Sequence, residues 1–188
     1  WGEQWGDVGA HIVDREQEIA DRSGGSLREH LMFQVGLSHF SERDEAIATA
    51  IIYALDEDGY LLDTPEEIRD SLAPEYLIDE LRAVLHRIQR MEPVGSATRD
   101  PAECIRVQLS VLPASTPGLE LARRIARDYI DLVAERDQDR LLGETGASEE
   151  TLKQALDLIR SLEPRPGARY DNREDEYLVP DVYLRRVD

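Results

Sequence analysis

Apolar side chains recur at steps of three and four residues along most of the chain from residue 26 onward. This is the period of an α-helix that buries one face. A long stretch from Glu75 to Met91 predicts one helix, and Leu119 to Ala134 predicts another. The inward positions of the first of these are expected to be Leu77, Leu81, Val84, Leu85, Ile88 and Met91. The pattern as a whole predicts an all-α protein with short connections.

Capping residues mark where the predicted helices begin. A Ser, Thr or Asp that precedes an acidic residue by three positions can accept a hydrogen bond from an unpaired amide of the first turn. Pairs with this spacing are Ser26 and Glu29, Ser41 and Asp44, Thr64 and Glu67, and Asp100 and Glu103, and Ser148 precedes the last predicted helix. Gly59 and Gly146 follow predicted helices, where glycine readily adopts the left-handed conformation.

Two segments, IQRMEPVG at 88–95 and IRSLEPRPG at 159–167, end a helix in the same way. A residue before proline is disfavoured in the α conformation, so each helix is expected to stop there. Two ordinary proline stops would explain this, but the shared Ile-x-x-apolar-Glu-Pro favours a duplicated structural unit. We expect five residues to shape these junctions: Met91, Pro93, Gly95, Pro164 and Gly167.

These signals divide the chain into four parts. Residues 1–25 are interpreted as an acidic linker, 26–95 as a first helical subdomain and 96–168 as a second. Residues 169–188 are interpreted as a strand segment, since EYLVPDVYLRRVD at 176–188 is rich in branched and aromatic residues without a helical period. The expected fold is therefore two small helical bundles in tandem, with a short C-terminal β-strand segment.

The charge balance narrows the choice of partners. Forty acidic residues stand against 22 basic ones, which gives a net charge of −18. Tight binding to a phosphate backbone requires clustered Lys and Arg, so direct nucleic-acid binding is disfavoured. The acidity suits basic protein partners, or it simply keeps the protein soluble. No apolar run is long enough to span a bilayer and no signal segment opens the chain, so we expect a cytoplasmic protein.

No arrangement of reactive residues indicates an enzyme. Cys104 is the only cysteine, which excludes an intrachain disulfide and a cysteine-based zinc cluster, and it is expected to be a buried apolar residue. The four histidines, His11, His30, His39 and His86, lack the paired spacing of a metal site. The sequence therefore predicts no catalytic residues, no metal and no cofactor.

One positively charged stripe stands out against the acidic background. Arg82, His86 and Arg90 share one face of the helix predicted at 75–91, and Arg87 lies beside them. Two interpretations remain open. The favoured one is that these side chains pair with acidic residues of the same protein. The other is that they form a docking face for an acidic element of a partner.

Four blocks of sequence, in order, carry a family resemblance. They are HxxxQVGLSHFSERDEAIATAIIYALDEDGYL from His30 to Leu62, IQRMEPVGSATRDPAECIRVQL at 88–109, IRSLEPRPG at 159–167 and YLVPDVYLRRVD at 177–188. Together they resemble the core-binding region of the bacterial sigma-54 family, the enhancer-dependent sigma factors of RNA polymerase. The resemblance covers about residues 26–188, and residues 1–25 look like the variable acidic linker of that family. The loop from Ser96 to Arg99 and Pro101 depart from the usual pattern.

The resemblance implies a non-catalytic module that docks on the β and β′ subunits of core RNA polymerase. Promoter DNA would be reached only through regions that these 188 residues do not contain, and the activator ATPase would act on the module indirectly. We therefore expect the chain to be a piece of a longer protein. Arg82, His86, Arg90 and Arg99 are the expected contact residues. The alternative is a free-standing helical adaptor or anti-regulator that binds a protein partner.

Overall fold

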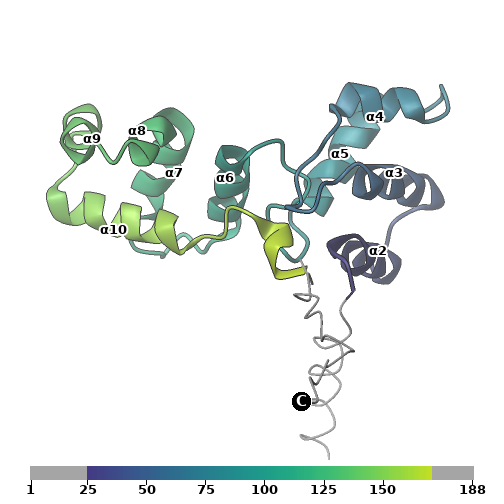
Figure 1. Cartoon of the computed structure of the whole chain (residues 1–188), viewed down its shortest axis with the longest axis horizontal. Helices are drawn as coiled ribbons and strands as arrows, with labels where there is room; N and C mark the ends of the chain where they lie inside the picture. Colours follow the sequence, from purple (N-terminus) through teal and green to yellow (C-terminus); the bar gives the residue numbers. More distant parts are fainter. Residues whose placement is uncertain (1–24, 171–188) are drawn as a thin grey trace, which may run out of the picture.

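The computed structural model describes residues 25–170, and these residues are mostly helical (Figure 1). The first four helices are α2 (Leu27–Leu37), α3 (Glu42–Tyr53), α4 (Pro65–Ser71) and α5 (Ile78–Ile88). They are followed by α6 (Pro101–Val111), α7 (Leu119–Asp128), α8 (Ile130–Ala134), α9 (Gln138–Thr145), α10 (Glu149–Ser161) and the 3₁₀ helix η1 (Pro166–Tyr170). Within residues 25–170 there is no β-sheet, only isolated bridges that join Leu55 to Leu61 and Tyr60 to Thr98. The predicted helical class is confirmed.

The predicted caps begin the helices as expected. Full capping boxes, in which side chain and backbone bond reciprocally, open α2, α3 and α4. The Asp100 carboxylate accepts from the Glu103 amide at 2.7 Å and opens α6, and the Ser148 hydroxyl does the same for α10. The reciprocal bond at α6 differs, because Glu103 accepts from the amide of Arg99 rather than from that of Asp100.

The helix predicted from Glu75 to Met91 is shorter than expected. It begins at Ile78, because the Glu80 carboxylate accepts from the Leu77 amide at 2.8 Å and makes Leu77 the capping residue. Leu77 was expected to be buried, and this was wrong: the residue is 62% exposed. At the other end the last bonds tighten to three-residue turns, with the Met91 amide donating to the Ile88 carbonyl, so the helix stops before Met91.

The single helix predicted from Leu119 to Ala134 is also wrong, because it breaks at Tyr129 into α7 and α8. In an uninterrupted helix the Ala126 carbonyl would accept from the amide of Ile130. It accepts instead from the guanidinium of Arg106 on α6, at 3.5 Å. A contact between helices therefore replaces the backbone bond at the break.

Buried apolar side chains form two clusters. The first draws on α2 to α5 and the loops beside them, with members Leu27, Leu31, Val35, Ile47, Ala48, Ile51, Ile52, Leu55, Leu61, Ile68, Leu81, Val84, Leu85, Ile88 and Ala97. The second draws on α6 to α10, with members Leu109, Leu119, Ala122, Ile125, Ala126, Leu132, Leu141, Leu152, Ala155, Leu156 and Ile159. Figure 1 shows the helices of the first cluster at one end of an elongated molecule, α7 to α10 at the other end, and α6 between them.

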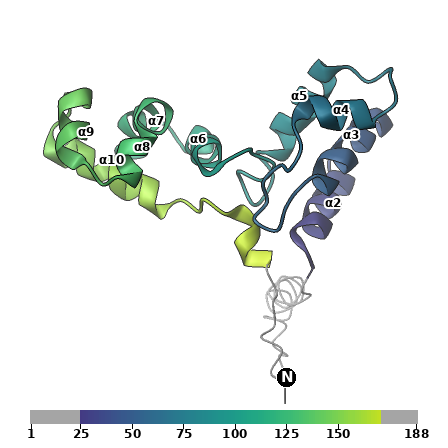
Figure 2. The same ribbon diagram turned by 45° about the horizontal axis from the view of Figure 1, so that its top comes forward.

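Two segments connect the ends of the molecule. One contains residues 89–100 and leads from α5 to α6; the other contains residues 162–170 and returns from α10 to the first end, where η1 lies (Figures 1 and 2). The strand predicted at 176–188 lies outside the described residues, while Arg169 and Tyr170 belong to η1. None of the helices within residues 25–170 is long and apolar enough to cross a membrane.

Candidate functional site

The basic stripe lies on the exposed side of α5, and one of its members is neutralised. Arg82 donates to Glu66 at 2.9 Å, and its guanidinium also lies 3.9 Å from the carboxylate of Asp79. These partners come from α4 and from the same helix. For Arg82, the favoured interpretation of pairing within the protein therefore describes the observed contacts.

The other end of the stripe keeps its charge. Arg90 donates to the carbonyl oxygen of His86 at 3.0 Å, and no carboxylate within residues 25–170 pairs with it. Arg87 is used differently, since its guanidinium stacks 3.6 Å from the centre of the Phe40 ring and lies 3.9 Å from Asp44. The stripe thus offers one unpaired guanidinium and an exposed imidazole.

Arg99 is separate from the stripe and closes the start of α6. Its Nε donates to Glu103 at 3.0 Å, and its backbone amide donates to the same carboxylate oxygen at 2.9 Å. The hydrogen bond that Arg99 donates to Glu103 raises the pKa of Arg99, so the guanidinium stays charged. Its observed contact is with its own helix start.

The first Glu-Pro motif is held by Gln34 of α2, a contact that the sequence analysis missed. The Glu92 amide donates to Oε1 of Gln34 at 3.1 Å, and Nε2 of Gln34 donates to the Glu92 carbonyl. A side-chain amide therefore pairs with both polar groups of one backbone residue. This satisfies the backbone where helix α5 has already ended.

The second Glu-Pro motif is held in the same way by Gln108 of α6. The Glu163 amide donates to Oε1 of Gln108 at 3.2 Å, and Nε2 of Gln108 donates to the Glu163 carbonyl at 2.6 Å. Nε2 also donates to the carbonyl of Val94 at 3.0 Å, so this side chain binds both connecting segments. Buried to 8% exposure, Gln108 is among the few buried polar side chains.

Gln34 and Gln108 occupy matching places in the chain. Each is the eighth residue of an eleven-residue helix that carries Glu at its third position. We name the two pairs the clamps: Gln34 with Glu92, and Gln108 with Glu163. The duplication predicted from the Glu-Pro motifs thus extends to the helix that binds each motif. The spacing of Glu and Gln after each cap was the signal in the sequence.

Both glycines predicted at the junctions, Gly95 and Gly167, are needed for close packing. Gly95 has φ of +97°, and a methyl group there would lie 2.5 Å from the sulfur of Cys104. At Gly167 a methyl group would meet the carbonyl oxygen of Glu57, and the Gly167 amide donates to the Asp58 carbonyl at 2.8 Å. The returning segment therefore lies directly against the 56–61 loop.

The proline junctions and Met91 also lie at these contacts. The peptide bond between Glu92 and Pro93 is cis. The carbonyl oxygen of Pro164 accepts from the hydroxyl of Tyr60, and burial raises the pKa of that hydroxyl to about 12. Met91 is partly buried against the first cluster.

Cys104 lies between the two connecting segments. Its sulfur is 3.3 Å from Nε2 of Gln108 and 3.7 Å from the carbonyl of Glu163. Burial raises the pKa of the thiol to about 11, which is the reverse of what a nucleophilic cysteine requires. The geometry agrees with the predicted packing role.

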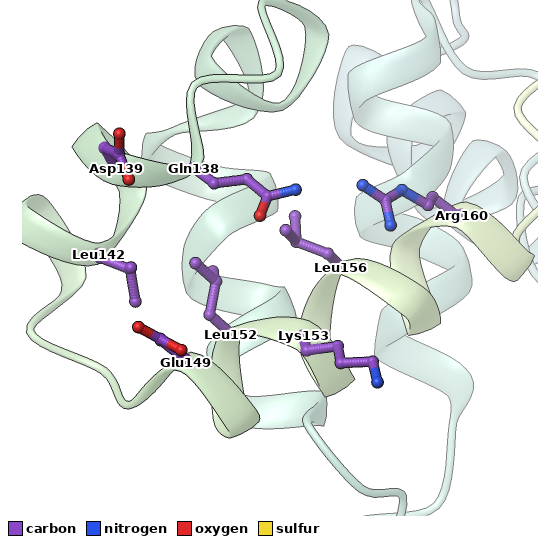
Figure 3. A pocket seen from close by; sticks show the side chains of 8 residues that line it. All are labelled: Gln138, Asp139, Leu142, Glu149, Leu152, Lys153, Leu156 and Arg160. Atoms are coloured by element: carbon purple, nitrogen blue, oxygen red, sulfur yellow. The ribbon is translucent and has the colours of Figure 1, made fainter.

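The grooves of the described part of the chain include two whose linings combine apolar and charged side chains. The joint groove, of about 270 Å³, is lined by Glu92, Pro93, Val94, Gln108, Val111, Leu112, Ser161, Leu162, Glu163, Pro166 and Arg169. Another groove of about 320 Å³ lies between α9 and α10, and its lining includes Leu142, Leu152 and Leu156 (Figure 3). Residues 25–170 contain no group of three or more His, Cys, Asp or Glu that could hold a metal.

Comparison with known proteins gives the family. The sequence profile described as "Sigma-54 factor, core binding domain" matches residues 16–188, which is most of the chain. The chain therefore belongs to the family of sigma-54 core-binding domains.

Relatives with the name "RNA polymerase sigma-54 factor" support this assignment. The protein of Salmonella typhimurium is 45% identical over 182 residues, which cover 96% of this chain and 38% of that protein. The Escherichia coli protein is 44% identical with the same coverage, and that of Azotobacter vinelandii is 45% identical over 166 residues, 87% of this chain and 33% of its own length. The chain thus spans between a third and two fifths of the length of these relatives.

Proposed function

We propose that the chain binds core RNA polymerase as the core-binding part of a sigma-54 transcription factor, and acts by docking alone. The observation that carries this proposal is the match of the core-binding profile to residues 16–188. The net charge of −18 supports a protein partner over DNA as the direct contact. The partner would place the protein in the bacterial cytoplasm.

The finer parts of the proposal concern the whole assembly. The polymerase surface would be provided by the β and β′ subunits. Promoter DNA would be bound by other regions of the factor, and the activator ATPase would act on this module indirectly. The acidic surface supports this division, because it repels a phosphate backbone.

We also propose that the two apolar clusters belong to two helical subdomains in tandem. The boundary predicted after residue 95 fits better after Thr98. The Ala97 amide donates to the carbonyl of Gly59 at 2.8 Å, and the Leu61 amide donates to the carbonyl of Thr98 at 2.9 Å. Ala97 is also a member of the first cluster.

Among the expected contact residues, His86 and Arg90 are the strongest candidates. The unpaired guanidinium of Arg90 can exchange water for an acidic group of the partner. Arg82 and Arg99 would first have to break their ion pairs with Glu66 and Glu103. Replacing both residues by alanine is expected to weaken polymerase binding several-fold. Arg136 and Arg140 are the matched control, because they have no ion pair within residues 25–170 and lie far along the chain, near α9.

Gel filtration with core polymerase from Escherichia coli tests the function itself. At micromolar concentrations the chain should elute with the polymerase. Separate elution of the two would contradict the proposal and favour the alternative of a free-standing adaptor. The polymerase is suitable because the sigma-54 factor of that organism is 44% identical to this chain.

A further inference from the structure

We propose that the chain docks through an apolar surface across its two clamps, which receives a polymerase segment with apolar anchors flanked by lysine or arginine. We call this surface the joint face. Its residues are Phe33 and Leu37 of α2 and the groove residues Pro93, Val94, Val111, Leu112 and Leu162. The inference rests on the proposed function, since it takes the polymerase as the partner.

Phe33 and Leu37 of α2 are large apolar side chains that remain exposed in the folded chain. Phe33 is 66% exposed and Leu37 is 68% exposed, while Leu31 and Val35 on the opposite side of α2 are buried. A four-residue step places Phe33 and Leu37 on one stripe of the helix. Two large apolar side chains in adjacent turns form a surface that a partner can cover.

The second half of the molecule repeats this arrangement. Val111 is the last residue of its eleven-residue helix, as Leu37 is of α2, and it is 44% exposed. Val111 lies in the joint groove together with Gln108, three residues before it. By the helical period, Leu37 stands in the same relation to Gln34, roughly 60° around the axis. Both halves therefore expose an apolar side chain beside a clamp.

The two apolar parts meet at the first Glu-Pro motif. The Gln34 amide, which the helical period places next to Leu37, binds the backbone of Glu92. Glu92 and Pro93 are also part of the lining of the joint groove, which extends to Val111. Figures 1 and 2 both show the returning segment and η1 between α2 and α6. The joint face thus spans the junction between the two ends of the molecule, from α2 to α6 and the connecting segments.

The charges around the joint face select a basic partner segment. Glu29 lies one turn before Phe33 on the same stripe, and Glu92 and Glu163 line the groove. Arg169 is the opposing cation of the groove lining, and its guanidinium lies 4.0 Å from Glu92.

The wider surface carries the same sign. Residues 26–98 contain 15 acidic residues and six arginines. A second copy of the chain, also at −18, is a poor occupant because it would bring like charges together.

Titration of Escherichia coli core polymerase against the N-terminally labelled chain, read by fluorescence anisotropy, tests the joint face. The double variant F33S/L37S is expected to bind at least about tenfold more weakly, as for the loss of central apolar anchors. V111S should also weaken binding. Glu92→Gln is expected to make the affinity less dependent on salt.

A matched control comes from equally exposed apolar residues elsewhere. Tyr53 is 66% exposed and Leu62 is 69% exposed, and neither lines the joint groove. The variant Y53S/L62S should therefore bind as the wild type does. Urea unfolding of both double variants checks that each is folded. We expect both to fold, because the substituted side chains are exposed.

The outcomes separate the two proposals. If the wild type fails to bind polymerase, the proposed function is wrong. If the wild type binds and F33S/L37S binds within about twofold of it, the function stands and the joint face is wrong. Equal losses in F33S/L37S and Y53S/L62S also overturn the joint face, because apolar area in general would then be responsible.

Discussion

Gln108 pairs with Glu163 through both atoms of its side-chain amide, 55 residues apart in sequence. The same amide nitrogen also donates to the Val94 carbonyl at 3.0 Å. One side chain therefore holds the segment that enters α6 and the segment that leaves α10. The contact is mostly buried, so water cannot replace it at low cost.

Gln108→Ala is expected to lower the free energy of unfolding by about 1–3 kcal/mol, because it leaves partly buried backbone groups of Glu163 and Val94 without partners. Urea unfolding followed by circular dichroism measures this loss. Gln34→Ala should cost less, because its clamp is exposed to water, which can replace the lost bonds.

Gln154 on α10 is the control for the first prediction. Its amide donates to Glu150 at 3.0 Å on the exposed side of the helix. Gln154→Ala should change stability by less than about 0.5 kcal/mol, as surface substitutions generally do. A cost equal to that of Gln108→Ala would show that the clamp has no special role.

Gly167→Ala is expected to destabilise the contact between the returning segment and the 56–61 loop. The added methyl group would overlap the carbonyl oxygen of Glu57, and relief requires the backbone to move. We expect a loss of about 1–3 kcal/mol, typical of overpacking. Thermal or urea unfolding measures it.

Gly143→Ala is the control for Gly167→Ala, because the same substitution is expected to have the opposite effect on stability. Gly143 lies within α9, and a methyl group there meets nothing within 4 Å. Gly143→Ala should therefore stabilise the protein, by about 0.5–1 kcal/mol, since alanine favours the helix. If both substitutions had the same sign, the packing argument for Gly167 would fail.

The sequence predicted the helices better than it predicted where they meet. Caps such as Ser26 and Thr64 are local signals, and each opens a helix as expected. The break at Tyr129 depends on a partner from another helix, which periodicity does not contain. Arg106 takes a carbonyl of α7 from 20 residues away.

The candidate site was predicted only in outline. The Glu-Pro motifs were found but the glutamines that bind them were missed. The repeated spacing of Glu and Gln after each cap marks these glutamines, but it does not show their partners, since Gln34 is 58 residues from Glu92. The charged stripe could be located, yet its pairing could not: Arg82 meets Glu66 only because α4 packs against α5. The exposure of Phe33 could not be predicted either, since apolar periodicity does not show which apolar side chains of a helix stay exposed.

Acid should weaken the contact between Arg43 and Glu80. The hydrogen bond from Arg43 lowers the pKa of Glu80 from 4.5 to about 2. The folded protein therefore keeps a carboxylate that the unfolded chain protonates, and the stabilisation is complete above pH 4.5 and lost as the pH falls towards 2. The urea concentration at the unfolding midpoint should therefore fall between pH 4.5 and 2, and it should fall less in the variant Glu80→Gln.

Asp79→Asn is the control for the acid prediction. Asp79 is adjacent to Glu80, but its carboxylate is the more distant partner of Arg82, at 3.9 Å. This variant leaves the pair of Arg43 and Glu80 intact and should keep the acid dependence of the wild type. An unchanged dependence in Glu80→Gln would show that the pair contributes nothing.

Alkali should weaken the contacts that Cys104 and Tyr60 make with the returning segment at residues 163 and 164. Burial raises the pKa of Cys104 from 9.0 to about 11 and that of Tyr60 from 10.0 to about 12. Over these intervals the unfolded chain has released protons that the folded chain retains, so stability is complete below pH 9 and falls as the pH rises through 9 to 12. The urea midpoint should therefore decrease with pH in this range.

Single variants separate the two contributions to the alkaline loss. Cys104→Ser should flatten the dependence between pH 9 and 11, and Tyr60→Phe between pH 10 and 12, whatever each costs at neutral pH. Tyr53→Phe is the control, because Tyr53 is 66% exposed and lies on α3. Thiolate absorbance of the folded protein already at pH 9 would contradict the prediction, since the buried thiol would then ionise like that of an unfolded chain.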